Sequence, residues 1–290
     1  MIYLILSITF STLILVVFKW FERFNINTFQ AIVSNYFVAF TVGFLLYGSE
    51  WQSQSLVETE WIPFALIIGF LFITLFLMMG KSAQINGIGT TSVAVKMSLA
   101  IPVVAAIFLY NESVYLFKIM GIAGALISVY LITKDKEKSK NSSIDTKKAT
   151  PILLVILFLG SGILDTLLNY AEKNVMTLIT PALFSAVGFG IAAIFGSLFL
   201  VYKLISGKEK LSLKSLFAGI VLGIPNYFSI FFLIMAIRQP MEDSITYAIN
   251  NVGIVVCSFL VGVLFFKEKV TPLKLFGGIL ALVAILLLSV

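Results

Sequence analysis

The sequence contains no histidine and a single cysteine, Cys257, in its 290 residues. Without histidine the chain has no Ser-His-Asp triad, no HExxH zinc motif and no imidazole for acid–base catalysis. One cysteine cannot form an intrachain disulfide and supplies only one thiolate, which excludes a cysteine-rich metal cluster. We therefore expect a protein that is not an enzyme and that binds no metal or other cofactor.

Charged residues are also scarce. They make up 12% of the chain, whereas 60% of the residues are hydrophobic and the mean hydropathy is +1.06. Soluble domains have about 25% charged and 45–50% apolar residues. The composition predicts a membrane protein.

The apolar residues fall into ten stretches, each near the roughly 20 residues that an α-helix needs to cross a bilayer. They are 3–18, 29–47, 62–80, 87–109, 115–133, 151–170, 180–202, 214–236, 244–266 and 272–289. None shows the ten-residue alternation of a transmembrane β-strand. The predicted fold is an all-α polytopic membrane protein with ten transmembrane helices.

Lysine and arginine are distributed unequally among the connecting segments. Sixteen follow odd-numbered stretches and three follow even-numbered ones. The positive-inside rule places the sixteen in the cytoplasm and both termini outside. The expected location is a cell membrane, the inner membrane of a bacterium. No base-stacking aromatics interleave the basic segment 134–150, so we expect contact with the lipid bilayer but no nucleic-acid partner.

The two halves of the chain can be aligned at a constant offset of 156 residues, which places Glu112 on Glu268 and Gly121 on Gly277. Five helices per half is an odd number, so the second half must cross the membrane in the opposite sense. Inverted repeats are typical of secondary transporters, whose related halves open a midplane site to alternate sides. The expected units are a first repeat at 1–133, a basic cytoplasmic linker at 134–150 and a second repeat at 151–290.

Each half closes with a small-residue helix, a short loop with a glutamate (YNES and FKEK) and a glycine-bearing helix. This pattern, over the whole chain, resembles the EamA-like branch of the drug/metabolite transporter superfamily. The resemblance implies secondary active transport by alternating access. Members of that superfamily move amino acids, other metabolites, toxic compounds, nucleotide sugars or sugar phosphates, so the resemblance implies a mechanism more than a substrate. Together with Lys96, a lysine inside an apolar stretch, we expect a small polar or anionic metabolite, amino-acid-like or phosphate-bearing. Bacterial members commonly keep both termini inside, whereas the distribution of charge here favours outside.

Two charged residues, Lys96 and Asp165, lie inside apolar stretches. A charge at the bilayer centre costs at least about 2.5–3.5 kcal/mol, so each must face a partner or a water-filled cavity. Five stretches carry one polar face each, and we expect these faces to line a central cavity between the first, fourth, sixth, eighth and ninth helices. The candidate substrate-binding residues are Ser11, Ser92, Lys96, Ser161, Asp165, Asn169, Asn226, Tyr247, Asn250 and Asn251.

Three roles are open for Lys96. In the first it pairs with Asp165 and holds two helices together, and in the second it binds an anionic group of the substrate. In the third, Lys96 or Asp165 binds and releases a proton during transport. Asn250 and Asn251, followed by Gly253, have two interpretations. The ninth helix is loosened there and the amides bind substrate, or the amides make interhelical hydrogen bonds.

Some alternatives stay open. Gly219xxxGly223 permits close helix approach, which we expect within the bundle rather than in a homodimer. The alternative functions are a flippase for a lipid-linked substrate, or a facilitator, of the same superfamily; an ion channel or an intramembrane enzyme is less favoured.

Overall fold

The computed structural model describes residues 1–48, 61–110, 114–134, 144–174, 181–237, 239 and 243–288, and all the secondary structure in these ranges is helical. The helices are α1 (Ile2–Arg23), α2 (Thr28–Tyr47), α3 (Trp61–Asn86), α4 (Ile88–Met97), α5 (Ala100–Tyr110), α6 (Leu116–Lys134), α7 (Ile144–Asn174), α8 (Pro181–Ile205), α9 (Leu213–Ile237), α10 (Asp243–Phe266) and α11 (Pro272–Leu288).

Most of these helices have the length and composition of membrane spans. Within the described ranges, nine helical segments are long and apolar enough to cross a membrane, and α4 with α5 forms one of them. The remaining helix, α11, is apolar but has 17 residues. Phe108, Ile205 and Phe265 are more than three-quarters exposed, which suits contact with lipid rather than water. The chain is therefore an all-α, multi-pass membrane protein, as the sequence predicts.

The helices differ from the predicted stretches in three places. The predicted span 87–109 is interrupted at Ser98 and Leu99, between α4 and α5. Helix α7 begins at Ile144, inside the predicted linker, and the linker residues 135–143 lie outside the described ranges. Helix α10 is continuous through 250–253, so the prediction of a loosened helix there is wrong.

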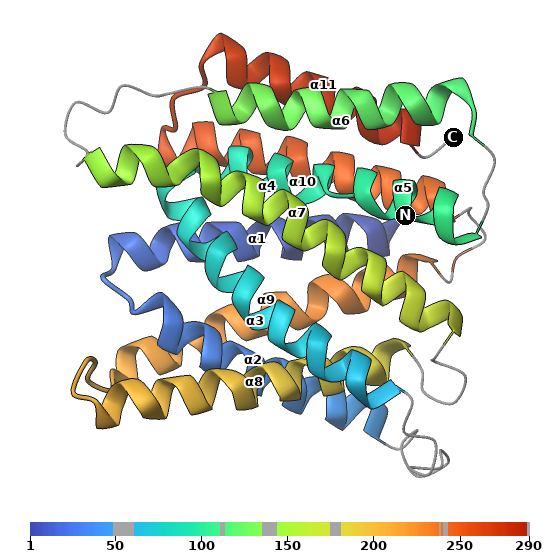
Figure 1. The fold of residues 1–290 in the computed structure, drawn as a ribbon. Helices are drawn as coiled ribbons and strands as arrows, with labels where there is room; N and C mark the ends of the chain where they lie inside the picture. Colours follow the sequence, from blue (N-terminus) through green and yellow to red (C-terminus); the bar gives the residue numbers. More distant parts are fainter. Residues whose placement is uncertain are drawn as a thin grey trace.

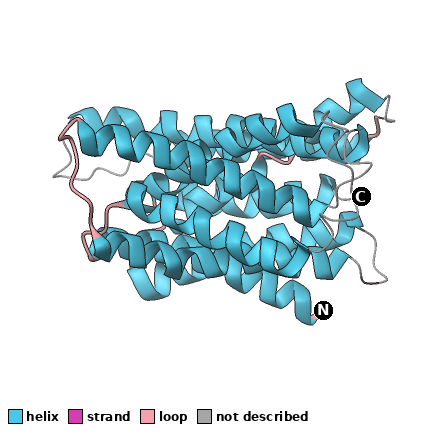
Figure 2. Cartoon of the chain, turned by 90° about the horizontal axis from the view of Figure 1, so that it is seen from below, coloured by secondary structure: helices cyan, strands magenta, loops and turns pink. Residues whose placement is uncertain are grey.

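The helices lie side by side, with the connecting segments at two ends of the bundle (Figures 1 and 2). Helices α6 and α11 pack together along one edge, and α2 and α8 pack together along the opposite edge. We call one end the basic end, because Arg23 at the end of α1 and the loop residues Lys208, Lys267 and Lys269 lie there. The first residue of α1 and the last residue of α11 lie at the other end (Figure 1).

Glycines set the closest helix contacts. A Cβ on Gly219 of α9 would lie 2.5 Å from the Cβ of Ser34 and 3.0 Å from the backbone nitrogen of Asn35 on α2. A Cβ on Gly223 would lie 3.0 Å from the carbonyl oxygen of Asn35. The Gly219xxxGly223 motif therefore packs within the bundle, as predicted. A homodimer stays a prediction.

At the basic end, the α8–α9 loop is bonded to the start of α2. Asn27 caps α2, because its side-chain oxygen accepts from the backbone N–H of Gln30 at 3.2 Å. Glu209, in the loop, accepts from Lys203 Nζ at 2.7 Å, from Asn27 Nδ2 at 3.2 Å and from Gln30 Nε2 at 3.4 Å. Partial burial raises the pKa of Glu209, but hydrogen bonds from Lys203, Gln30 and Asn27 outweigh that effect and hold the pKa below its ordinary 4.5.

This network predicts an acid dependence of stability. A carboxyl whose pKa is lower in the folded state stabilises the fold above its unfolded pKa, and this contribution is lost as the pH falls through the folded pKa. Glu209→Gln should therefore lower the thermal unfolding midpoint near neutral pH and flatten its decline below about pH 4.5. The measurement is the midpoint of the purified protein from pH 7 to pH 3. Glu22→Gln, which removes an exposed carboxylate from the same end, is the control. An unchanged decline in Glu209→Gln would contradict the prediction.

Candidate functional site

The break between α4 and α5 has a local cause in the sequence. Pro102 has no backbone N–H, so it cannot donate to the carbonyl of Ser98 four residues earlier. Ile101 N–H donates to that carbonyl at 2.9 Å instead, and Leu99 N–H donates to the carbonyl of Lys96 at 3.4 Å. These three-residue bonds tighten the turn and end α4 at Met97. The chain therefore forms two half-helices within one membrane span.

The two intramembrane charges lie at this break. Lys96 is in the last turn of α4 and half-buried, and Asp165 on α7 is also half-buried. Ser98 Oγ lies 3.4 Å from Asp165 Oδ2 and 2.6 Å from the carbonyl oxygen of Val95. The charges of Lys96 and Asp165 are close enough to interact, yet within the described ranges neither makes an ion pair at 4.0 Å or less.

Helix geometry favours this distribution of charge. A cation is stabilised near the C-terminus of a helix and an anion near an N-terminus. Lys96 occupies the C-terminal turn of α4, and Asp165 lies beside Ser98, just before α5 begins. On α7, Gly162 packs directly against Ile101 of α5. The sequence placed Lys96 and Asp165 in one region correctly, but a direct ion pair is not present.

The other predicted residues on α4 and α7 lie around these charges. Ser92 is buried, and its hydroxyl donates to the carbonyl of Gly89 in its own helix at 2.7 Å, so its proton is already used. Ser161 is buried one turn before Asp165, and Asn169 is exposed one turn after it.

A second polar group lies where α10 meets α1 and α9. Gly253 of α10 packs on Ile8 of α1, and Ser7 of α1 donates to the carbonyl of Ser229 on α9 at 3.0 Å. Several buried side-chain atoms on α1, α2, α9 and α10 have no hydrogen-bond partner in the described part of the chain, at a cost of about 1–3 kcal/mol each. These atoms are Thr12 Oγ1, Asn226 Nδ2, Thr246 Oγ1, Asn250 Oδ1, Ser258 Oγ and both amide atoms of Asn35.

The remaining predicted residues are divided between the two groups. Asn251 is buried on the side of α10 that carries Ala248 and Val255, which pack in one cluster with residues of α4. Tyr247 is exposed, and Ser11 is half-buried on α1. No hydrogen bond in the described ranges joins Lys96 or Asp165 to Asn226 or Asn250, so a single cavity lined by all five helices stays a prediction.

The sequence analysis did not identify some residues that shape the two polar groups. Pro102 was a readable signal, because it stands four residues after Ser98 in an otherwise uninterrupted span. Thr12 and Thr246 had no distinguishing signal, since a threonine in an apolar stretch normally bonds to its own helix. Their orphaned hydroxyls are visible only in the packed structure.

No protein-family model matches the chain. Over 288 residues, covering 97% of this chain and 95% of the relative, it is 29% identical to an uncharacterized protein of Haemophilus influenzae. The fold is similar to that in a crystal structure of a protein, with a TM-score of 0.60 and 12% sequence identity. That similarity covers 99% of this chain and 94% of the other, and it concerns the fold alone.

Proposed function

We propose that this protein is a secondary active transporter of a small polar or anionic metabolite, similar to the EamA-like branch of the drug/metabolite transporters. The observation that carries the proposal is the placement of Lys96 and Asp165 at the break between α4 and α5. Broken membrane helices place charged side chains and half-helix ends around substrates in transporters. A purely structural pair of charges would be expected to close into a direct contact, because each unpaired charge is costly in lipid.

The proposal includes two inverted five-helix repeats, and reciprocal contacts support it. Gly121 of α6 packs on Leu288 of α11, and Gly277 of α11 packs on Ile132 of α6. Adding the offset of 156 to Gly121 and Ile132 gives Gly277 and Leu288, so each contact corresponds to the other. The two chain ends also lie at one end of the bundle, as an even number of crossings requires (Figure 1).

A second pair of contacts follows nearly the same offset. Gly69 of α3 lies close to the carbonyl of Gly188 on α8, and Gly223 of α9 lies close to the carbonyl of Asn35 on α2. A Cβ added to either glycine would lie 3.0 Å from that carbonyl oxygen. Related contacts at both edges are what two interleaved halves of similar structure would make. Such halves could exchange conformations and so expose the Lys96 region to alternate sides.

The charges suggest the substrate chemistry. Lys96 is suited to a carboxylate or phosphate group, and the orphaned amides of Asn226 and Asn250 can bond to the polar remainder of a small molecule. We place the basic end in the cytoplasm by the positive-inside rule. Proton coupling through Asp165 or Lys96 is part of the proposal and is tested separately below.

The test begins with ligand-induced thermal stabilisation of the detergent-purified protein against carboxylates, amino acids and phosphate esters. A ligand at 100 times its Kd stabilises the folded state by about 2.7 kcal/mol. Each stabilising compound is then used in proteoliposomes loaded with unlabelled compound, and we expect accumulation of external labelled compound by counterflow.

Coupling is tested in the same vesicles by dissipating the pH gradient and the membrane potential. Net uptake that falls to the equilibrium level while counterflow persists would agree with proton coupling. Uptake that is insensitive to both treatments would make the protein a facilitator or exchanger. The transport proposal fails if stabilising compounds show no counterflow, or if the purified protein converts them chemically.

A further inference from the structure

Helix α4 begins without a cap from its own sequence. Gly87 precedes its first residue, Ile88, and has no side chain that could cap the helix. The carboxylate of Glu268 takes this role, because it accepts the backbone N–H of Ile88 with its two oxygens at 3.0 and 3.1 Å. A Cβ on Gly87 would lie 2.5 Å from Glu268 Oε2, and a Cβ on Gly262 would lie 2.6 Å from it, so both glycines make room for the carboxylate. The bond joins the first half of the chain to the loop that follows α10.

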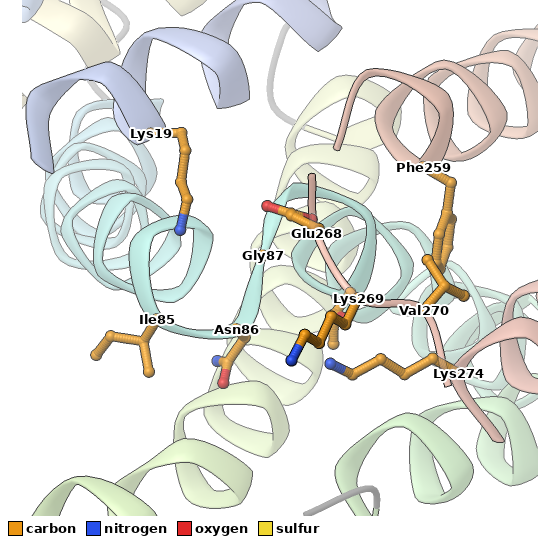
Figure 3. A pocket seen from close by; sticks show the side chains of 10 residues that line it. Lys19, Ile85, Asn86, Gly87, Phe259, Glu268, Lys269, Val270 and Lys274 are labelled. Atoms are coloured by element: carbon orange, nitrogen blue, oxygen red, sulfur yellow. The ribbon is translucent and has the colours of Figure 1, made fainter. Parts of the chain in front are cut away.

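A cavity of about 100 Å³ lies beside this bond, at the basic end of the bundle. It is bordered by the end of α3, the start of α4 and the α10–α11 loop (Figure 3). Glu268 lies against the turn at Gly87, and Phe259 of α10 forms another wall. Liquid water occupies roughly 30 Å³ per molecule, so the cavity has room for a few water molecules.

The ring of Phe259 packs onto the face of α4 that carries Lys96. A Cβ on Gly89 of α4 would lie 2.7 Å from this ring, and a Cβ on Gly278 of α11 would lie 3.0 Å from it. The ring is therefore wedged between two helices at positions that have no side chain. Gly89, Ser92 and Lys96 share one face of α4, because they are three and four residues apart. The ring thus covers this face at its basic end, between the cavity and Lys96.

The seam between α4 and α10 continues inward from the ring to Lys96. The two helices run in opposite directions, since the start of α4 and the loop after α10 both border the cavity. Lys96 is seven residues beyond Gly89, which is about 10 Å along the helix axis. On α10, Asn251 and Phe259 are eight residues apart, so Asn251 lies at a similar depth. Val255, between them, packs in one cluster with residues of α4. The seam therefore leads from the cavity to two of the candidate substrate residues.

We propose that the seam between α4 and α10 is the route from the basic end to Lys96, with the Phe259 ring as its barrier and Glu268 as its latch. This inference rests on the proposed transport function and specifies how one side of the binding site is closed. The ring can leave the seam, because the two glycines beside it have no side chains that interlock with it. Glu268 touches no substrate and is a positioning residue for the start of α4. The structure is then the state in which the basic end is closed.

The barrier is tested by the reaction of an introduced cysteine with a membrane-impermeant thiol reagent. Cys257→Ala removes the native cysteine, and Ser92→Cys places a new one at a buried position beyond the ring. The membrane vesicles expose the basic end, as reaction of Lys267→Cys in parallel vesicles shows. We expect Phe259→Ala to raise the labelling rate at position 92 at least about tenfold, since the ring no longer closes the seam. Phe265→Ala truncates an exposed ring of the same helix and should leave the rate unchanged.

Ser128→Cys distinguishes opening of the seam from general loosening of the bundle. Ser128 is buried on α6, where it donates to the carbonyl of Gly277 on α11, and labelling there should stay slow in Phe259→Ala. Phe259→Leu, a smaller change, takes the place of Phe259→Ala if the unfolding midpoint shows that the alanine variant does not fold. Equal acceleration at positions 92 and 128, or no acceleration at position 92 in a folded variant, overturns the proposal.

The latch is tested in the same assay. Glu268→Ala removes both acceptor oxygens and should also accelerate labelling at position 92. Glu268→Gln keeps one acceptor for the Ile88 N–H and should restore most of the original rate. Glu22→Ala removes an exposed carboxylate at the same end and should have no effect. An unchanged rate in Glu268→Ala overturns the latch.

Labelling needs no substrate, so its result is separate from the result of the transport assay. Accelerated labelling without counterflow of any compound would contradict the transport function and support the route. Counterflow without acceleration in the Phe259 variants would support transport and overturn the route.

Discussion

Lys96→Met is expected to abolish substrate binding while leaving the protein folded. Removing a buried charge that bonds to an oppositely charged group costs about 2–5 kcal/mol, so the Kd of an anionic ligand should rise at least roughly 30-fold. In the structure Lys96 makes no ion pair within 4.0 Å in the described ranges, so the ligand-free protein loses no direct contact. The measurement is the Kd of each compound found by thermal stabilisation, together with the unfolding midpoint without ligand.

A double-mutant cycle separates this role from a structural one. If Lys96 serves chiefly to balance Asp165, then Lys96→Met alone should destabilise the ligand-free protein, and Lys96→Met/Asp165→Asn should restore its stability. If Lys96 binds substrate, the single variant is stable and the double variant does not recover binding. Lys81→Met, an exposed lysine of α3, controls for the change in net charge. Unchanged ligand affinity in Lys96→Met would remove this residue from the substrate site.

Gly219→Ala is expected to destabilise the fold by about 1–3 kcal/mol, because overpacking forces backbone shifts when the neighbours cannot rotate away. The new Cβ would meet the carbonyl oxygen of Ala31 and the backbone nitrogen of Asn35, so α2 and α9 would have to separate. The higher helix propensity of alanine opposes this effect by up to about 1 kcal/mol. The measurement is the free energy of unfolding in mixed micelles.

Gly188→Ala is the matched control for this change. Gly188 also lies inside a helix, but the atoms nearest to an added Cβ would belong to the side chains of Phe72 at 3.0 Å and Ile68 at 3.9 Å, which can adjust. We expect Gly188→Ala to lie within about 1 kcal/mol of the unmodified protein. Equal stability of the two variants would show that α2 and α9 do not pack as closely as the structure describes.

Hydropathy alone predicted the helical spans well, because lipid requires each crossing segment to be apolar and to satisfy its own backbone. It also identified Lys96 and Asp165, since a charge in such a segment needs an environment of its own. The break at Ser98 could have been predicted from Pro102. The sequence instead predicted a loosened helix at 250–253, where α10 is a continuous helix. Asparagines and a glycine weaken a helix only slightly, whereas proline removes a hydrogen bond.

The role of Glu268 could not be predicted from local sequence. Its partner, the N–H of Ile88, is 180 residues away, and only the packing of α4 against α10 brings the two together. In the sequence Glu268 appears as a charged residue in the short loop that follows an apolar span. Its alignment with Glu112 indicates an internal repeat but does not identify the group that Glu268 binds. Glu112 itself lies outside the described ranges.

The packing of α2 has a consequence for the synthesis of the protein. Its neighbours α8 and α9 come from the other half of the chain, and Gln30 Nε2 donates to the carbonyl of Lys210, 180 residues later, at 2.8 Å. At translation rates of about 5–20 residues per second, roughly 10–40 s separate the appearance of the two partners. During this interval the buried amide of Gln30 lacks its final partners. The nascent first half is therefore an incomplete folding unit that depends on the second half, and a ribosome that stalls between them leaves a membrane-inserted fragment without its native packing.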